Sequence, residues 1–590
     1  MKKIIDIISE ELMQAFEAKG YDSQYGSVSL SNRPDLCQYQ CNGALSAAKA
    51  YRKAPIMIAN EVVEVLKNSK TFEKIEAIMP GFINISLNSE FLADYLNEMN
   101  TADQFGLEKT SNPKTIVIDY GGPNVAKPLH VGHLRSAVIG ESIKRISRYV
   151  GHNVIGDVHL GDWGLQMGLI ITELKKRKPD LVYFDENYTG EYPAEAPFTI
   201  SELEEIYPAA NEYSKTHPEY KEEAKNATFL LQNGNRGYMA LWNHILNVSV
   251  TDLKKNYEKL NVSFDLWKKE SDAQPYIPDM IGYLKENNYT RISEGALVVD
   301  VKEETDTKEI PPCMILKSDG ATLYNTTDLA TMVERMKLFN PDAITYIVDK
   351  RQELYFEQVF RCAKKTKLVG ENVKLTFLGF GTMNGKDGKP FKTRDGGVMR
   401  LETLINEIND AVYKKIMDNR EMSEEEAKDI SQKVGLAALK YGDLSNQASK
   451  DYVFDIDRFI SFEGDTGPYI LYTIVRIKSI LAKYEEQTGT REIAVNSVLP
   501  TNIKSEITLM LQAAKFNDVI MNAYEDNAPH RVCQYIYDLA NTFNSFYHEN
   551  KIIAEEDKEK QQSWISLIML IEGILETCIE LLGFEAPDRM

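Results

Sequence analysis

Two histidines three residues apart, His130 and His133, open a segment whose apolar spacing predicts a helix ending near Val150. They follow an apolar run, Thr115–Tyr120, that is typical of a buried parallel strand. A helix start after such a strand binds anions, because unpaired N–H groups and the helix dipole point to the same place. Two imidazoles add side-chain donors there, and Gly132 between them lets a flat group such as a purine approach the backbone. The chemistry that this arrangement suits is stabilisation of a phosphate during transfer.

The histidine pair also has a structural explanation that the pattern leaves open. Both side chains could lie on the surface, with one of them capping the helix. Lys127, three residues before His130, favours the functional explanation. It places a third cationic donor beside the same anion site.

A glycine-rich cationic stretch, Gly379–Gly397, is the second candidate for chemistry. Besides six glycines it holds Lys386, Lys389, Lys392 and Arg394. Flexible glycines would allow a loop to close on a triphosphate, and lysines would neutralise the charge that develops on it. A solvated β-hairpin, turning at Asn384-Gly385 or Asp387-Gly388, explains the same residues without function. The stretch follows the second half of the predicted sheet and occurs together with the histidine site. Both observations favour the functional loop.

The segment Tyr324–Asp328 lies where a further helix is predicted to begin. Its polar side chains are candidates for ligand binding. The simpler explanation is that Thr327 or Asp328 is the N-cap of that helix.

Bulk composition limits the class of protein. The chain has 590 residues, 43% of them hydrophobic, and a net charge of −20, which argues against binding nucleic acid along an extended surface. Nine basic residues against two acidic ones between Arg361 and Arg394 suggest a partner held at selected places instead. The sequence has no window of 18 or more uninterrupted apolar residues, so no membrane span is predicted. Six scattered cysteines indicate neither a zinc site nor disulfides, which fits a reducing cytoplasm.

The order of predicted elements suggests an α/β protein of several domains. Residues 1–108 are predicted to form a small α+β unit, and the strand at 115–120 opens an α/β domain over 109–400. A long, polar, helical pattern at about 165–290 is interpreted as an insertion that splits this domain. The second half of the parallel sheet is expected from three strand-like runs, Ala296–Val301, Ile344–Val348 and Leu375–Phe380. Residues 401–460 are predicted as a helical junction, followed by a helical domain over 461–590.

Several motifs in order resemble those of class I aminoacyl-tRNA synthetases. His130-Val-Gly-His133 is similar to their His-Ile-Gly-His motif, and the basic stretch takes the place of their second motif. The context Pro123-Asn124, Lys127 and Gly161-Asp-Trp-Gly164 resembles arginyl-tRNA synthetases in particular. Further similarity lies in Phe462–Tyr469, Tyr472 with Arg476, and the terminal Asp588-Arg-Met590. The resemblance thus covers nearly the whole chain.

The resemblance implies a fold, a reaction and partners. It implies a Rossmann-type parallel-sheet catalytic domain split by an insertion, an N-terminal domain that grips the corner of tRNA, and an all-helical anticodon-binding domain. The implied reaction forms arginyl-adenylate from L-arginine and ATP, then transfers the arginyl group to the terminal ribose of tRNA(Arg). ATP with magnesium is then a substrate, with no tightly bound cofactor and no resident metal. A cytoplasmic monomer is expected.

The resemblance also implies roles for individual residues. Catalytic roles fall on His130, His133, Lys127, Lys392 and Arg394. ATP contacts fall on His130, Gly132, His133, Lys389 and Lys392, and arginine contacts on Asp119, Asn124, Tyr324, Asp328 and Gln352. Because a guanidinium is planar and permanently charged, its recognition needs rigid acceptors. Asp328 with Tyr324 is assigned to that group, and Asn124 with Asp119 to the α-amino group.

Two departures from the family pattern carry consequences. The chain lacks the Lys-Met-Ser-Lys-Ser sequence at Lys392–Arg394, and Lys127 is expected to compensate, as in many arginyl enzymes. Tyr355 stands where related chains often carry a histidine, which leaves its role as a donor to ribose or phosphate open.

Two other classes compete with this interpretation. Another adenylate-forming enzyme with the same histidine motif would leave the N-terminal unit and the helical C-terminal half unexplained. A non-catalytic RNA-binding relative would be expected to lack His130, His133 or the basic stretch, and all are present.

Overall fold

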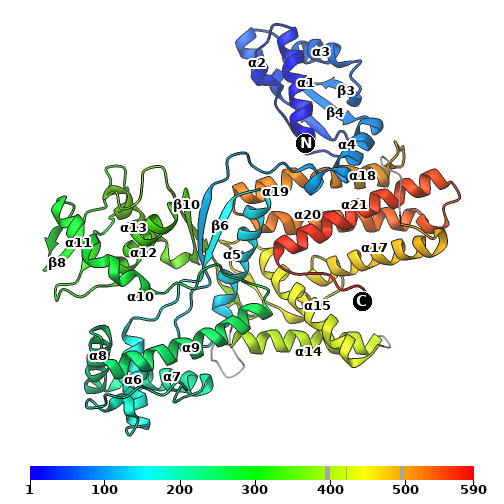
Figure 1. Ribbon diagram of the computed structural model, residues 1–590. Coiled ribbons are helices and arrows are strands. Elements are labelled where there is room, and N and C mark those ends of the chain that lie inside the picture. Colours follow the sequence, from blue (N-terminus) through cyan, green and yellow to red (C-terminus); the bar gives the residue numbers. More distant parts are fainter. Residues whose placement is uncertain (392–398, 420–421, 492–496) are drawn as a thin grey trace.

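The computed structural model describes residues 1–391, 399–419, 422–491 and 497–590. Three parts follow one another along the chain: a small N-terminal unit, a central unit built on a parallel sheet, and a C-terminal group of helices (Figure 1). A fourth group of helices, from within the central unit, extends away from the C-terminal group (Figure 1). The predicted α/β architecture, with an interrupted catalytic unit between an α+β and a helical part, is confirmed.

The N-terminal unit packs helices against an antiparallel sheet. Its helices are α1 (Ile4–Ala18), α2 (Gly43–Tyr51) and α3 (Pro55–Leu66). The strand order is β1-β2-β4-β3, with bounds Val28–Leu30, Tyr39–Cys41, Phe82–Leu87 and Phe72–Ile78. The unit is joined to the rest through α4 (Ser89–Thr101), where Asn97 exchanges hydrogen bonds with the backbone of Val498 (2.9 and 3.0 Å).

A four-stranded parallel sheet forms the centre of the molecule. Its order is β11-β10-β5-β6, with bounds Lys374–Phe380, Ala343–Asp349, Thr115–Tyr120 and Asn153–Asp157. The chain runs outward from β5 to β6 and, in the second half, from β10 to β11, so the strand order reverses between β5 and β10. Ligands of open α/β sheets bind at the carboxyl ends of the strands beside such a switch point. Helix α5 (Val131–Tyr149) starts at this edge, as predicted.

One strand prediction is wrong. The run Ala296–Val301 forms β8 (Ala296–Val299) of a separate antiparallel sheet, with β7 (Arg291–Ser293) and β9 (Cys313–Leu316) on either side. The chain reverses at Glu294 and Gly295, whose φ angles of 49° and 83° suit a two-residue hairpin turn. All four residues of β8 are buried, which is why the run looks like a parallel strand in the sequence.

Helices fill the segments around the sheet. The predicted insertion contains α6 (Leu165–Arg177), α7 (Ile200–Thr216), α8 (Pro218–Gln232), α9 (Arg236–Lys259), α10 (Glu270–Ala273) and α11 (Ile277–Glu286). After the small sheet come α12 (Tyr324–Phe339), before β10, and α13 (Glu353–Lys365), between β10 and β11. The boundaries given for the insertion and the domains stay predictions.

The C-terminal part is helical, as predicted. It comprises α14 (Leu401–Asn419), α15 (Glu424–Leu444), α16 (Ile456–Phe459), α17 (Gly467–Thr488), α18 (Lys504–Ala513), α19 (Phe516–Glu525), α20 (Pro529–Glu549) and α21 (Lys558–Leu582). Two short strands, β12 (Met383–Asn384) and β13 (Tyr452–Val453), pair in parallel and join it to the central unit. None of the helices in the described part of the chain has the length and apolar character needed to cross a bilayer.

Candidate active site

Both histidines of the motif cap helix α5, and capping prepares them for a second role. His130 is the N-cap, and its Nδ1 accepts a hydrogen bond from the backbone N–H of Gly132 (3.0 Å). Nδ1 of His133 accepts from the backbone N–H of His130 (3.1 Å). Because each Nδ1 acts as an acceptor, each neutral ring carries its proton on Nε2. The backbone of the helix start therefore sets both imidazoles as Nε2–H donors.

The environment keeps these rings neutral. Burial and the nearby charge of Lys127 lower the pKa of His130. Burial, together with His130 and Lys127, lowers the pKa of His133 to about 3. The ring centres are 3.9 Å apart, so two charges there would also repel each other. Around neutral pH the pair acts through hydrogen bonds and not as a strong acid.

Gly132 has a structural reason beyond the approach of a purine. A Cβ at this position would lie 2.7 Å from Cε1 of the His130 ring, closer than non-bonded carbons approach. Any larger residue would move the ring that caps the helix. Gly132 itself is exposed, which leaves its backbone open to a ligand.

A pocket of about 270 Å³ opens beside this helix start. Its wall is formed by the first turn of α5, the ends of strands β10 and β11, and the segment after β11. The lining residues are His130, Val131, Gly132, Arg135, Asp349, Arg351, Phe380, Gly381, Thr382, Met383, Pro390 and Phe391. The helix start, the imidazole of His130 and apolar side chains together suit a nucleotide, with phosphate at the helix start.

The basic stretch is a hairpin where it is described. Asn384 bridges to Pro390, and the N–H of Gly385 donates to the carbonyl of Lys389 (2.8 Å). The turn lies at Asp387-Gly388, one of the two positions expected from the sequence, and Gly388 has a φ of 73°. Lys389 is exposed on this hairpin. Lys392 and Arg394 lie outside the described residues.

Lys127 contacts the inserted helices, and its charge acts on the histidine site. Its Nζ lies 4.7 Å from the ring centre of Tyr207 on α7, a cation–π contact. Its charge is also one cause of the lowered pKa of both histidines. Lys127 thus stands between the helix start and the inserted helices.

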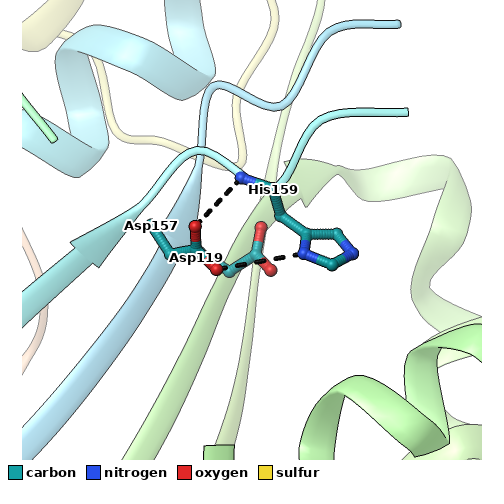
Figure 2. Close-up of side chains that lie close together, drawn as sticks. All are labelled: Asp119, Asp157 and His159. Carbon is teal, nitrogen blue, oxygen red and sulfur yellow. Dashed lines mark hydrogen bonds and ion pairs between the residues drawn. The ribbon is translucent and has the colours of Figure 1, made fainter. Parts of the chain in front are cut away.

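On the other side of the switch point, Asp119 belongs to a buried charge cluster. Asp119, Asp157 and His159 lie close together at the ends of β5 and β6 (Figure 2). Such a trio could hold a metal ion, but Nη2 of Arg335 already binds Oδ2 of Asp119 (2.6 Å) and Oδ2 of Asp157 (2.9 Å). We therefore assign these carboxylates to the buried guanidinium, which holds Asp119 rigid at the strand end.

His159 is held in an unusual backbone conformation. Its φ is 40°, a left-handed value that is uncommon outside glycine. Among the described residues neither ring nitrogen has a hydrogen-bond partner, although both atoms are buried. An imidazole fixed in this way faces the acidic groups around it, since Asp157 Oδ2 lies 3.9 Å from its Nδ1.

The start of helix α12 carries the second group of predicted arginine contacts. The N-cap is Leu323, and the side chain of Thr326 accepts a hydrogen bond from its N–H (3.2 Å), so the expected cap at Thr327 or Asp328 is wrong. The helix therefore starts four or five residues earlier than expected, and Thr326, the third residue after the cap, is the acceptor at its start. Asp328 is thereby left free for another role.

Asp328 is held by a tyrosine and surrounded by acidic groups. The hydroxyl of Tyr355 donates to its carboxylate, and burial raises the pKa of Asp328. Burial also raises the pKa of Glu270 to about 7, with further raising contributions from Asp162 and Asp328. Acids that are held close together with raised pKa values form a site ready for a cation.

The remaining predicted contacts lie on three further segments of the chain. Tyr324 is 70% exposed at the start of α12, and Gln352 is exposed before α13. Asn124 lies in the loop after β5, pressed against Gly161, where an added Cβ would come 2.1 Å from its Oδ1. Asp119 and Asp328 belong to the same acidic region, since the charge of Asp119 contributes to the raised pKa of Asp328. All five arginine assignments stay predictions.

Four residues of this region were missed by sequence reasoning: Asp157, His159, Glu270 and Arg335. Asp157 ends a strand of the parallel sheet, so identifying β6 would have pointed to it. Glu270 and Arg335 reach the site from segments far along the chain, and no local pattern marks either.

Comparison with known proteins decides the family. Residues 96–456 match the family described as tRNA synthetases class I (R), catalytic domain. Residues 470–590 match the DALR anticodon binding domain, and residues 2–87 the arginyl tRNA synthetase N terminal domain. The arginine–tRNA ligase of Agathobacter rectalis is 63% identical over 597 aligned residues, covering 100% of both chains.

The chain belongs to the arginyl-tRNA synthetase family.

Further relatives agree with this assignment. The arginine–tRNA ligase of Alkaliphilus oremlandii is 62% identical, again over 100% of both chains. Among solved structures, the arginyl-tRNA synthetase of Plasmodium falciparum superimposes with a TM-score of 0.82 at 26% identity, covering 100% of both chains. The arginyl-tRNA synthetase of Thermus thermophilus, at 21% identity and a TM-score of 0.77, shares the fold over 99% of this chain and 100% of its own. The arginyl-tRNA synthetase resemblance seen in the motifs is thus confirmed over the full length.

Proposed function

We propose that the chain activates L-arginine with ATP and transfers the arginyl group to tRNA(Arg), and that the acidic region and the pocket at the start of α5 hold the first two substrates. One observation carries this proposal: an acidic region with raised pKa values at Asp328 and Glu270 lies across the switch point from a helix start with two neutral imidazoles. Arginine brings two cations, one at each end. Both are matched by acceptors fixed on the sheet edge and on α12.

The arginine end is divided between two groups of acceptors. Asp328, aligned by Tyr355 and with Glu270 nearby, receives the guanidinium, and Tyr324 closes over it. Asn124 and Asp119 receive the α-amino group, although Arg335 already binds one oxygen of Asp119. Gln352 at the start of α13 completes the set. Tyr355 then acts on the amino acid and not on ribose or phosphate.

Residues at the start of α5 bind ATP. The arginine carboxylate attacks the α-phosphorus of ATP, and pyrophosphate leaves. The Nε2–H groups of His130 and His133 donate to phosphate oxygens as negative charge grows on them, with Lys127 adding a charge. Gly132 leaves room for the nucleoside, and Lys389 reaches the site from the hairpin. No protein nucleophile is needed, because positioning and charge stabilisation suffice. ATP enters as its magnesium complex and no cofactor is retained.

The other parts of the chain serve the tRNA. We propose that residues 1–108 contact its corner and residues 461–590 its anticodon, while the terminal ribose hydroxyl attacks the adenylate carbonyl. The family matches at residues 2–87 and 470–590 support this division. We further propose that the protein works as a monomer in the cytoplasm.

The test is exchange of labelled pyrophosphate into ATP, measured with each amino acid, with and without tRNA. We expect exchange with arginine alone, and only when tRNA(Arg) is present, because the chain lacks the standard lysine loop motif of class I enzymes at 392–394. A matched control uses tRNA with its terminal adenosine oxidised, which binds but cannot accept. Strong exchange with arginine in the absence of tRNA would contradict the tRNA dependence, and exchange with a different amino acid would refute the substrate.

Arginine affinity should rise with pH through neutrality. Glu270 has a pKa of about 7 in the free site, so below that pH it carries a proton that a guanidinium must displace. Affinity is therefore low when Glu270 is protonated and highest above its pKa, a gain of about tenfold between about pH 6 and pH 8. Calorimetry in buffers of different ionisation enthalpy would register a proton released on binding. Glu270→Gln is the control and should remove both the release and the slope; an unchanged slope in that variant would assign the proton elsewhere.

A further inference from the structure

Arg135 is a fully buried guanidinium one turn into helix α5, five residues after His130. Its side chain is 2% exposed and lies in the wall of the nucleotide pocket. A buried charge of this kind is stable only when its donors are met by acceptors. Its acceptors come from three separate segments of the chain.

The guanidinium joins the pocket to the C-terminal helices. Nη1 donates to the carbonyls of Gly381 and Lys450, both at 2.9 Å. Nε donates to Oδ2 of Asp443 on α15 (3.1 Å), and the guanidinium carbon lies 4.9 Å from the ring centre of Tyr452. Gly381 follows β11 in the pocket wall, while Lys450 and Tyr452 lie on either side of the start of β13.

These contacts strengthen the short strand pair that connects the pocket wall to the segment after α15. The strands that join the two parts, β12 and β13, pair over only two residues each. The N–H of Gly381 donates to the carbonyl of Ala448 (2.9 Å), and its carbonyl binds Arg135. A two-residue strand pair is weak by itself, whereas charge-assisted hydrogen bonds in a buried setting are strong.

The ion pair between Arg135 and Asp443 leaves one polar atom of each side chain without a partner among the described residues. These atoms are Nη2 of Arg135 and Oδ1 of Asp443. Oδ2 of Asp443 also accepts a hydrogen bond from the hydroxyl of Tyr452 (2.8 Å). The two carbonyls therefore contribute as much to the direction of the guanidinium as the carboxylate does. This favours a role in holding backbone segments in place over a role in charge neutralisation alone.

We propose that Arg135 is a positioning residue for ATP. It holds the segment Gly381–Met383 against the first turn of α5, so that the two walls of the nucleotide pocket keep a fixed separation. It also joins this wall to α15 and to the segment before β13, one of the links between the nucleotide pocket and the helical part. The inference rests on the proposed function, because it takes the ligand of that pocket to be ATP.

The test compares Arg135→Lys with a matched change on the same helix. Arg145 also donates to one carboxylate, Glu141 (2.8 Å), and to two carbonyls, those of Glu580 (2.9 Å) and Asn261 (3.1 Å). Ten residues further along α5, it lies about 15 Å from Arg135 and away from the pocket. Both lysine variants lose a guanidinium fork and should melt at lower temperature.

Only Arg135→Lys should weaken the binding of ATP. We expect the dissociation constant for ATP, measured by calorimetry on the full chain, to rise about tenfold, the effect of removing charge-assisted hydrogen bonds from one wall. The dissociation constant for arginine should stay within about twofold of the wild type. Arg145→Lys should leave both constants unchanged. Equal ATP affinities in the two variants, or a parallel loss of arginine affinity in Arg135→Lys, would overturn the proposal.

A milder variant keeps the test decisive if Arg135→Lys does not fold. Tyr452→Phe keeps the ring beside the guanidinium but removes the hydroxyl that donates to Asp443. It should lower the affinity for ATP, as Arg135→Lys does, but by a smaller factor. Unchanged ATP binding in a folded Tyr452→Phe protein would count against the proposal. ATP affinity is measured without amino acid, so its loss in Arg135→Lys stands even if pyrophosphate exchange identifies a substrate other than arginine.

Discussion

Replacing Asp328 with asparagine should weaken L-arginine binding by at least about thirtyfold, in line with the 2–5 kcal/mol lost when one partner of a buried charge pair is removed. Asparagine keeps the shape of the side chain, and its carbonyl oxygen can still accept the hydrogen bond from Tyr355. Only the negative charge that faces the guanidinium is lost. ATP affinity should be unchanged, since the nucleotide pocket is lined by other segments. Calorimetric titration of each substrate measures both effects.

A matched control separates recognition from stability. Asp306 binds the guanidinium of Arg361 (2.7 and 2.8 Å), an ion pair that holds a loop outside the substrate region. Asp306→Asn removes a carboxylate–guanidinium pair of the same kind and should leave arginine affinity as it is. If Asp328→Asn titrates arginine like the wild type, the assignment of the guanidinium to Asp328 is refuted.

Changing His133 should slow adenylate formation with little effect on arginine affinity. The Nε2–H donor acts on charge that grows only in the transition state, so its loss lowers the rate by about a hundredfold to a thousandfold, as for other preorganised donors. His133 also caps α5 through Nδ1, and simple truncation to alanine removes that hydrogen bond too. The loss of a cap is worth about 1 kcal/mol in stability.

Two amide variants divide these roles. In His133→Asn the amide can replace Nδ1 and keep the cap, but no donor remains at the Nε2 position. In His133→Gln the amide reaches the Nε2 position and can restore part of the donation. We expect the asparagine variant to be stable and slow, and the glutamine variant to be faster, in single-turnover adenylation with tRNA present. A change confined to the Michaelis constant for arginine in both would contradict a role in phosphate stabilisation.

The parts of the site that the sequence predicted are those formed by neighbours along the chain. Strand β5, the start of α5 and the cap at His130 follow from residues within about twenty positions of one another, and each has a local physical signal. The hairpin turn at Asp387-Gly388 follows from two residues. The error at Ala296–Val301 arose where the local signal is ambiguous, because a buried antiparallel strand and a buried parallel one have the same apolar pattern.

The acidic region could not be predicted in the same way. Glu270, Arg335 and Tyr355 reach Asp119 or Asp328 across long stretches of chain, and a single carboxylate or tyrosine in a helix carries no sign of its partner. Their pKa values are properties of burial and of neighbours in space, which no window of sequence contains. The same holds for Arg135, whose acceptors lie just before β13, on α15 and in the segment after β11.

The amino-acid sequence by itself determined the chemistry at the start of α5: two histidines at helical spacing around a glycine, behind a buried strand, because capping and tautomer depend only on the local backbone. Through its motifs it also indicated the family. The tertiary structure alone decided which carboxylates are already bound by a guanidinium of the chain itself. Arg335 binds Asp119 and Asp157, whereas Asp328 accepts a hydrogen bond from Tyr355 and forms no ion pair among the described residues, since charge balance in a buried site depends on which segments fold against it.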